Sequence, residues 1–140
     1  MTPLRVGAVS FLNTVPLIEG LADEPGIEVV RDLPSRLARM LDDGEIDVGL
    51  IPVVEYLRGV GGSMVPGLCI GAHGAVRTVK MFSRVPLRDV RRVAVDRGSR
   101  SSVALLHVLL GELHGIVPEV EEFEPRFDSL FDVADTVLVI

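Results

Sequence analysis

The interpretation of this chain begins with the stretch Ser10-Phe11-Leu12-Asn13-Thr14-Val15-Pro16-Leu17. An apolar run at residues 4–9 comes before it and predicts a buried strand, and the apolar segment at residues 15–21 predicts a short helix. The serine, asparagine and threonine of the stretch therefore lie at the carboxyl end of the first strand, where open α/β sheets bind their ligands. The same residues also suit a capped turn between strand and helix, and spacing alone leaves both interpretations open.

Composition narrows the class of protein. The chain has 140 residues, of which 48% are hydrophobic and 4% aromatic, so aliphatic side chains fill the core, as in parallel sheets that are covered on both faces. A net charge of −6 argues against a nucleic-acid partner, and no apolar run reaches the roughly 20 residues that a membrane-spanning helix needs. The single cysteine, Cys69, excludes an internal disulfide, and the N-terminus has no signal-peptide pattern, so a cytoplasmic protein is expected.

Strands and helices alternate along the chain, which predicts an α/β fold with a largely parallel sheet. The segment at residues 84–89 is polar and contains a proline, and we interpret it as a crossover. The expected domains are a first α/β lobe at residues 1–83 and the start of a second lobe at residues 84–140. The expected strands are residues 4–9, 27–31, 47–51, 64–72, 75–83, 92–95, 117–123 and 136–140, and the expected helices are residues 15–21, 34–41, 53–58, 103–113 and 128–133.

A second polar loop comes directly before the clearest helix, which is expected at residues 103–113. Free backbone N–H groups at the start of a helix attract anions, Gly98 lets the loop approach a ligand closely, and the nearby Arg97 and Arg100 add positive charge. An ordinary serine N-cap explains the same residues, so this choice also stays open. The candidate binding residues in this loop are Ser99, Ser101 and Ser102.

A third group consists of Arg77 and Ser83, around the last strand expected before the crossover. If two lobes enclose a cleft, Arg77 could meet a ligand carboxylate there; otherwise it is a surface charge. The three groups would then surround one small anion with hydroxyls, amides and arginine, but with no histidine or carboxylate base. His107 and His114 have no third ligand beside them, so no metal site is expected. The chain also lacks the P-loop, G-x-G-x-x-G, G-x-S-x-G, C-x-x-C and H-E-x-x-H motifs.

Several ordered stretches carry a resemblance to a known family. They are VGAVSFLNTVPL at residues 6–17, GEIDVGLIP at 44–52 followed by EYL at 55–57, VPGLCI at 65–70, VRTV at 76–79 and DRGSRSSVALL at 96–106. On these stretches the chain resembles the chorismate dehydratases of the futalosine route to menaquinone. The resemblance covers the whole chain but only about the first half of the family's usual length. The chain also ends inside an expected core strand at residues 136–140, so an N-terminal fragment is expected.

The resemblance implies a fold similar to that of type 2 periplasmic binding proteins, with two α/β lobes and a cleft between them, incomplete in this chain. It also implies a lyase that removes water from chorismate to give 3-[(1-carboxyvinyl)oxy]benzoate, with no cofactor. By match to the family's motifs, Asn13 is the chief catalytic candidate, and Ser83, Ser101 and Ser102 hold the carboxylates of the substrate. The remaining substrate-binding candidates come from the residue pattern alone and are Ser10, Thr14, Arg77 and Ser99.

The expected mechanism follows from the lack of a histidine or carboxylate base among the candidate residues. An elimination must remove a ring proton and expel hydroxide, so one of the substrate's own carboxylates is the expected base, and Asn13 would orient it or stabilise developing charge. Two alternatives stay open: a non-catalytic module of the same fold that binds small anions, and a chain that is inactive because it is incomplete. The related enzyme that makes 1,4-dihydroxy-6-naphthoate opens with a different motif, which disfavours it. Chorismate is the expected partner, without nucleic acid or membrane, and the oligomeric state, including a homo-oligomer, is left open.

Overall fold

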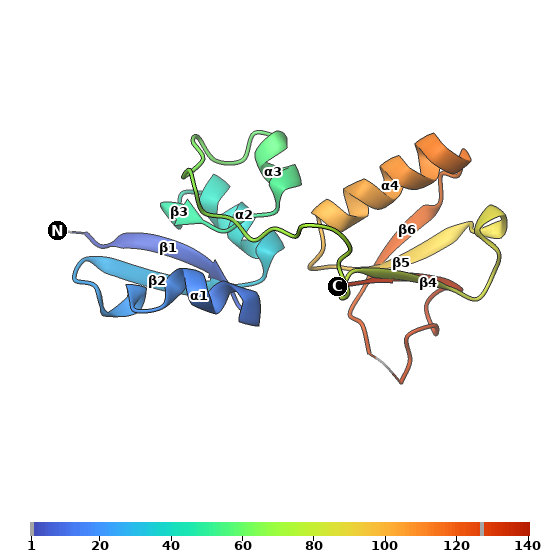
Figure 1. The fold of residues 1–140 in the computed structure, drawn as a ribbon, viewed down its shortest axis with the longest axis horizontal. Helices are drawn as coiled ribbons and strands as arrows, with labels where there is room; N and C mark the ends of the chain where they lie inside the picture. The colour runs from blue at the N-terminus through green and yellow to red at the C-terminus, as the bar shows by residue number, and fades with distance from the viewer. Residues whose placement is uncertain (1, 127) are drawn as a thin grey trace. The chain divides into compact units, whose positions relative to one another are not determined.

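The computed structural model describes residues 2–126 and 128–140. It divides into two compact units, Met1–His73 and Gly74–Ile140, each with its own strands and helices (Figure 1). Each unit contains parallel strands with helices between them, and this confirms the predicted α/β class. Among the helices in the described part of the chain, none combines the length and the apolar character that crossing a bilayer requires.

The first unit is built on a three-stranded parallel sheet with the strand order β2-β1-β3. In chain order its elements are β1 (Leu4–Val9), the 3-10 helix η1 (Leu12–Thr14), α1 (Val15–Ile18), the 3-10 helix η2 (Leu21–Asp23), β2 (Ile27–Asp32), α2 (Pro34–Asp42), β3 (Val48–Gly49) and α3 (Val53–Leu57). The central strand is β1, and its last residue, Val9, pairs with Asp32 at the end of β2. Since the strands are parallel, their carboxyl ends meet at one edge of the sheet, directly before Ser10.

The core of this unit lies between the sheet and α2. Leu37 from the helix is buried together with Val9 from β1 and Ile46, which comes shortly before β3. Gly7 allows this close packing, because a Cβ atom at its position would run into the side-chain ends of Ile46 and Leu37. The helix predicted at residues 34–41 is therefore confirmed as α2, since its apolar face has a sheet to cover.

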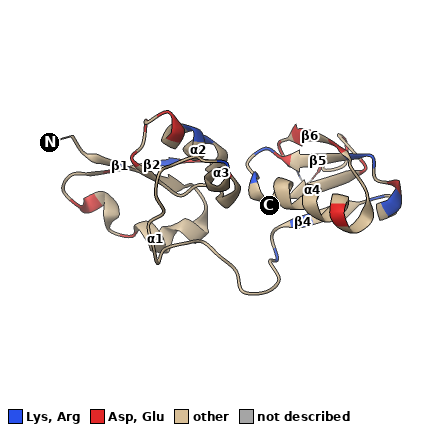
Figure 2. Cartoon of the chain, turned by 90° about the horizontal axis from the view of Figure 1, so that it is seen from above, with Lys and Arg blue, Asp and Glu red and all other residues tan. Residues whose placement is uncertain are grey.

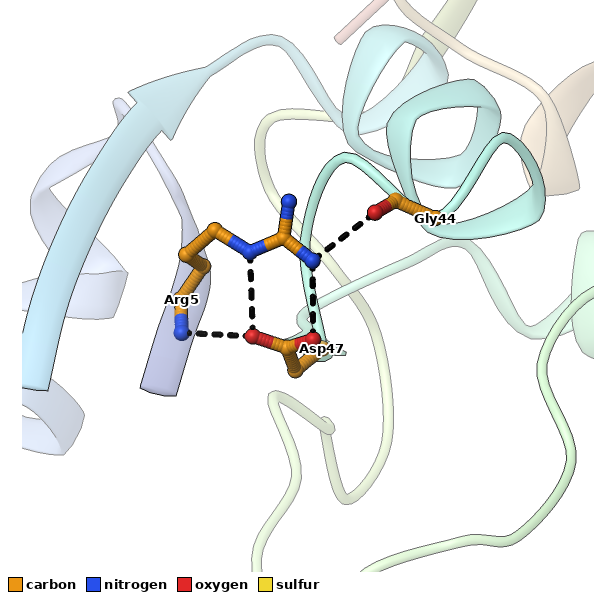
Figure 3. A network of polar contacts seen from close by, with 3 residues as sticks. All are labelled: Arg5, Gly44 and Asp47. Atoms are coloured by element: carbon orange, nitrogen blue, oxygen red, sulfur yellow. Dashed lines mark hydrogen bonds and ion pairs between the residues drawn. The ribbon is translucent and has the colours of Figure 1, made fainter. Parts of the chain in front are cut away.

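An arginine and an aspartate join β1 to the segment that leads into β3 (Figure 3). The Nε and Nη2 groups of Arg5 donate to the two carboxylate oxygens of Asp47, at 3.1 and 2.9 Å, and the Arg5 backbone N–H donates to the same carboxylate at 2.8 Å. Nη2 of Arg5 also donates to the carbonyl oxygen of Gly44 at 2.8 Å. Because the side chain and then the backbone N–H of Arg5 donate to it, the pKa of Asp47 is lowered to about 2.

The second unit contains a four-stranded sheet with the order β4-β7-β5-β6. In chain order its elements are β4 (Lys80–Ser83), the 3-10 helix η3 (Leu87–Asp89), β5 (Arg92–Asp96), α4 (Ser101–His114), β6 (Glu119–Phe123) and β7 (Thr136–Val139). Three of these strands, β6-β5-β7, are parallel and repeat the second-first-third order of the first unit, whereas β4 runs antiparallel to β7. Because β4 belongs to this sheet, the boundary between the units lies earlier than the expected one after Ser83.

The long helix α4 lies along one face of this sheet (Figure 1). Its buried side chains, Leu106 and Leu110, pack against Val93 and Val95 of β5 and Leu138 of β7. The helix predicted at residues 103–113 is thus confirmed and begins slightly earlier than expected.

Three expectations for regular structure are wrong wholly or in part: the strands at residues 64–72 and 75–83 and the helix at residues 128–133. Residues 64–72 and 75–79 form no strand, and side chains at residues 61–80 are exposed, because no neighbouring strand pairs with this segment in the described chain. Residues 128–133 form turns and bends instead of a helix. There the apolar side chains of Leu130, Phe131 and Val133 pack beside Ala134 without needing helical spacing.

Candidate functional site

The first set of candidate groups lies at the carboxyl end of β1. Ser10 continues the pairing of β1 with β2 by one residue, since its backbone N–H donates to the carbonyl oxygen of Asp32 at 3.1 Å. The side chains of Ser10 and Asn13 are exposed and make no hydrogen bond to any residue that the structure describes. Neither η1 nor α1 has a side-chain cap. The interpretation of this stretch as a capped turn is therefore not supported, and its exposed polar groups are uncommitted.

Thr14 is placed differently from its neighbours. Its side chain is fully buried, and its Oγ1 atom has no hydrogen-bond partner among the described residues. A buried hydroxyl without a partner is costly, because it gives up its hydrogen bonds to water. The structure therefore places the Thr14 side chain in the interior, and its substrate contact stays a prediction.

A charged pair beside Ser10 was not predicted. The Oδ2 atom of Asp32, the last residue of β2, lies 3.2 Å from Nε of Arg36 in the first turn of α2. Its Oδ1 atom accepts a hydrogen bond from the backbone N–H of Leu33 at 2.7 Å. The spacing of an acid and an arginine four residues apart at the start of an expected helix could have indicated this pair.

The carboxylate after β3 is also paired. Glu55 in α3 accepts a hydrogen bond from Nη1 of Arg58 at 3.0 Å, and its side chain is only 17% exposed. Both carboxylates near the described strand ends of unit 1, Asp32 and Glu55, are thus held by arginines. Each of these two carboxylates therefore has an arginine as its charged partner.

The second set of candidate groups precedes α4. The backbone N–H groups of Gly98 and Ser99 both donate to Asp96, to Oδ1 and to the carbonyl oxygen respectively, each at 2.9 Å. This turn leaves Ser99 only 6% exposed, and its hydroxyl makes no hydrogen bond to a described residue. Arg100 occupies the N-cap position without a side-chain cap, so the serine N-cap, one of the two alternatives left open by the sequence, is not formed. Ser101 and Ser102 begin the helix itself, where backbone N–H groups favour an anion.

The arginines of this loop are already paired with glutamates. Arg97 lies 3.1 Å from Glu124, and Arg100 lies 3.7 Å from Glu122. Figure 2 shows the acidic residues along β6, beside β5. The positive charge expected from Arg97 and Arg100 is therefore largely compensated, and any anion at this loop would depend on backbone N–H groups and hydroxyls.

Ser83 does not join this loop. It pairs with Thr136 at the amino end of β7, because β4 runs antiparallel, whereas the loop follows the carboxyl end of β5. Ser83 and the loop therefore lie at opposite ends of the parallel strands β5 and β7. The Ser83 hydroxyl is also committed: it lies 2.8 Å from the carbonyl oxygen of Val85 and 2.8 Å from Thr136 Oγ1, and it accepts from the Val85 N–H at 3.2 Å.

Arg77 lies in the exposed segment before β4 and makes no ion pair or hydrogen bond with a described residue. The structure thus describes two separate sets of candidate groups, Ser10 with Asn13 in the first unit and Ser99, Ser101 and Ser102 in the second, and their joint role stays a prediction. Within residues 2–126 and 128–140 it shows no cluster of three histidine, cysteine or acidic side chains that could hold a metal ion.

Comparison with known proteins shows the family to which the chain belongs. The chain is 33% identical over 141 residues to a chorismate dehydratase from Thermus thermophilus; the match covers 100% of this chain and 51% of the relative. The chain therefore spans about half the length of this curated relative. The crystal structure of PA01 protein from Pseudomonas aeruginosa, whose description names the LysR family of transcriptional regulators, matches 99% of this chain and 55% of its own. Its identity is 16% and its TM-score 0.40, and we draw no conclusion from it. Residues 4–140 match the model of a family described as menaquinone biosynthesis, and the chain belongs to that family.

Proposed function

We propose that this chain is a chorismate dehydratase, which removes water from chorismate to give 3-[(1-carboxyvinyl)oxy]benzoate. The observation that carries the proposal is the pair of uncommitted polar side chains, Ser10 and Asn13, directly beyond the central strand of the first sheet. The family of the chain and the name of its T. thermophilus relative support the choice of reaction.

Chorismate is a small dianion, and the second unit by itself also offers groups that suit a carboxylate. The start of α4 supplies backbone N–H groups, and Ser99, Ser101 and Ser102 supply hydroxyls near them. The dipole of a 14-residue helix favours negative charge at this end. These groups are neutral, so they can hold a carboxylate without adding a base to the site.

The elimination balances without a cofactor. One ring C–H bond and the C–O bond to the ring hydroxyl break, a C=C bond forms and makes the ring aromatic, and the proton leaves with hydroxide as water. Because Asp32 and Glu55 are held by Arg36 and Arg58, we assign the proton transfer to a carboxylate of the substrate. The amide of Asn13 would donate a hydrogen bond to the group on which negative charge develops.

The direct test is to mix the purified chain with chorismate and follow the absorbance of the aromatic product, with its identity checked by mass spectrometry. Formation of 3-[(1-carboxyvinyl)oxy]benzoate is expected. Tight binding of chorismate with no product would instead establish the second candidate, a non-catalytic anion-binding module. That candidate is favoured by one observation, the pairing of both carboxylates at this edge with arginines.

A further inference from the structure

The function proposed above uses the pair of Asp32 and Arg36 only to exclude Asp32 as a base and assigns Arg36 no contact with the substrate. The backbone oxygen of Asp32 accepts a hydrogen bond from Ser10 N–H at 3.1 Å, and its Oδ2 atom lies 3.2 Å from Arg36 Nε. Ser10, Asp32 and Arg36 thus form a continuous polar chain from the end of β1 to the first turn of α2. The pair therefore lies next to the backbone of Ser10, at the same edge of the sheet as the first set of candidate groups.

The ion pair leaves part of the guanidinium group available. Arg36 meets Asp32 through Nε, no second described residue forms an ion pair with it, and its side chain is 66% exposed. Asp32 itself is fixed, because its other carboxylate oxygen accepts from Leu33 N–H and its side chain is only 23% exposed. The terminal nitrogens of a guanidinium that is held in this way can bind a carboxylate in a bidentate manner.

The other arginines of the first unit are placed less well for this role. Arg5 is tied to Asp47 near the amino end of β1, and Arg58 is tied to Glu55. Arg39 lies one turn further along α2. Arg31 precedes Asp32 in β2, so its side chain points to the opposite face of the sheet.

We propose that Arg36, held in place by Asp32, binds a carboxylate of the substrate and gives the first unit its selectivity for a doubly charged ligand. This role rests on the proposed function. It adds charged N–H donors to the neutral groups of Ser10 and Asn13, since the ion pair with Asp32 uses Nε of Arg36 and not its terminal nitrogens. Charge-assisted N–H donors offset part of the cost of removing a carboxylate from water.

The test is calorimetric titration of the chain and its variants with chorismate and, separately, with benzoate as a probe that has a single carboxylate. Arg36→Gln is expected to weaken chorismate binding by about 10- to 100-fold, the range typical of a charge-assisted hydrogen-bond pair. Arg36→Lys keeps the charge but not the planar fork, so a smaller loss is expected. Asp32→Asn frees Arg36 from its anchor and should also weaken binding, by less than Arg36→Gln.

The matched control is Arg39→Gln, which removes the same charge from the same helix and should leave chorismate affinity unchanged. The ratio of chorismate affinity to benzoate affinity should fall in Arg36→Gln and stay constant in Arg39→Gln. A variant that only loses its fold would bind both ligands more weakly, with the ratio unchanged. Equal chorismate affinity in Arg36→Gln, Arg39→Gln and the unmodified chain would refute the role of Arg36 and leave the proposed function intact. No chorismate binding by the unmodified chain would refute the proposed function and this role with it.

Discussion

The hydroxyl groups of Ser83 and Thr136 lie 2.8 Å apart and join β4 to β7 at the edge of the second sheet that faces away from the loop before α4. Thr136 is fully buried, and Ser83 is the partner that the structure gives to its hydroxyl. Replacing Ser83 with alanine would leave this hydroxyl unpaired. We expect Ser83→Ala to lower the free energy of unfolding by about 1–3 kcal/mol, measured by urea denaturation.

The same variant tests the position of Ser83 against the role that the family resemblance implies. Because its hydroxyl is committed to Val85 and Thr136, Ser83→Ala should leave the affinity for chorismate unchanged. Ser101→Ala, at the start of α4, is the comparison and should weaken binding. If Ser83→Ala weakens chorismate binding in the fraction of protein that is still folded, Ser83 contacts the substrate as the resemblance implies.

Asn13 is expected to act on the reaction and not on the fold. Its side chain is exposed and makes no hydrogen bond to a described residue, so Asn13→Ala should leave the unfolding midpoint unchanged. If its amide stabilises developing charge, the variant should raise the barrier by about 2–4 kcal/mol, a drop of roughly 10²–10³ in kcat. The measurement is steady-state turnover of chorismate. Leu12→Ala is the control, because this neighbour is 86% exposed and has no polar group; unchanged turnover in Asn13→Ala would exclude the role.

Asp47 should make stability depend on pH in the acid range. Its pKa is lowered from 3.8 to about 2 by the side chain and the backbone N–H of Arg5, so folding favours the ionised form. The contribution is therefore fully present above about pH 4 and is lost as the pH falls toward 2. Urea unfolding midpoints measured between these values should fall less steeply in Asp47→Asn than in the unmodified chain. Asp43→Asn, an exposed residue of the same segment, should keep the original slope.

The variant Gly7→Ala tests how tightly the core of the first unit is packed. A Cβ atom at this position would lie 3.0 Å from Leu37 Cδ2 and would run into Ile46 Cδ1. Both partners are buried, so neither can move freely, and Gly7→Ala should lower the free energy of unfolding by about 1–3 kcal/mol. Gly62→Ala is the matched control, since a Cβ there meets nothing within 4 Å. Equal stability of the two variants in urea would show that the core around Gly7 is looser than described.

The parts of the fold that the sequence predicts well are those whose pattern is local. The apolar residues of α2 and α4 repeat at helical spacing, so each helix carries its own evidence. A strand is different, because it exists only where another strand pairs with it. Residues 64–72 are as apolar as the strand at β1, but no neighbour pairs with them, and composition alone cannot show this.

That Ser10 and Asn13 bind the substrate stays a prediction. Their position directly after a strand was predictable, because the end of an apolar strand is visible in the sequence. The position of Ser83 was not, because it depends on the direction of β4 relative to β7, a relation between residues more than 50 positions apart. The burial of Thr14 was not predictable for a related reason, since which side of a short 3-10 helix faces the core is decided by packing.

The variant Thr14→Val tests whether packing decides which side of the 3-10 helix η1 faces the core. Its buried Oγ1 atom has no partner among the described residues, so an isosteric methyl group in its place should remove an unpaired polar atom without opening a cavity. We therefore expect Thr14→Val to raise the free energy of unfolding by about 1 kcal/mol, measured by urea denaturation. Thr136→Val is the matched control and should do the opposite, because the hydroxyl it removes is paired with Ser83. If Thr14→Val is less stable, the hydroxyl has a partner such as a buried water molecule, and if it weakens chorismate binding at unchanged stability, the side chain reaches the ligand after all.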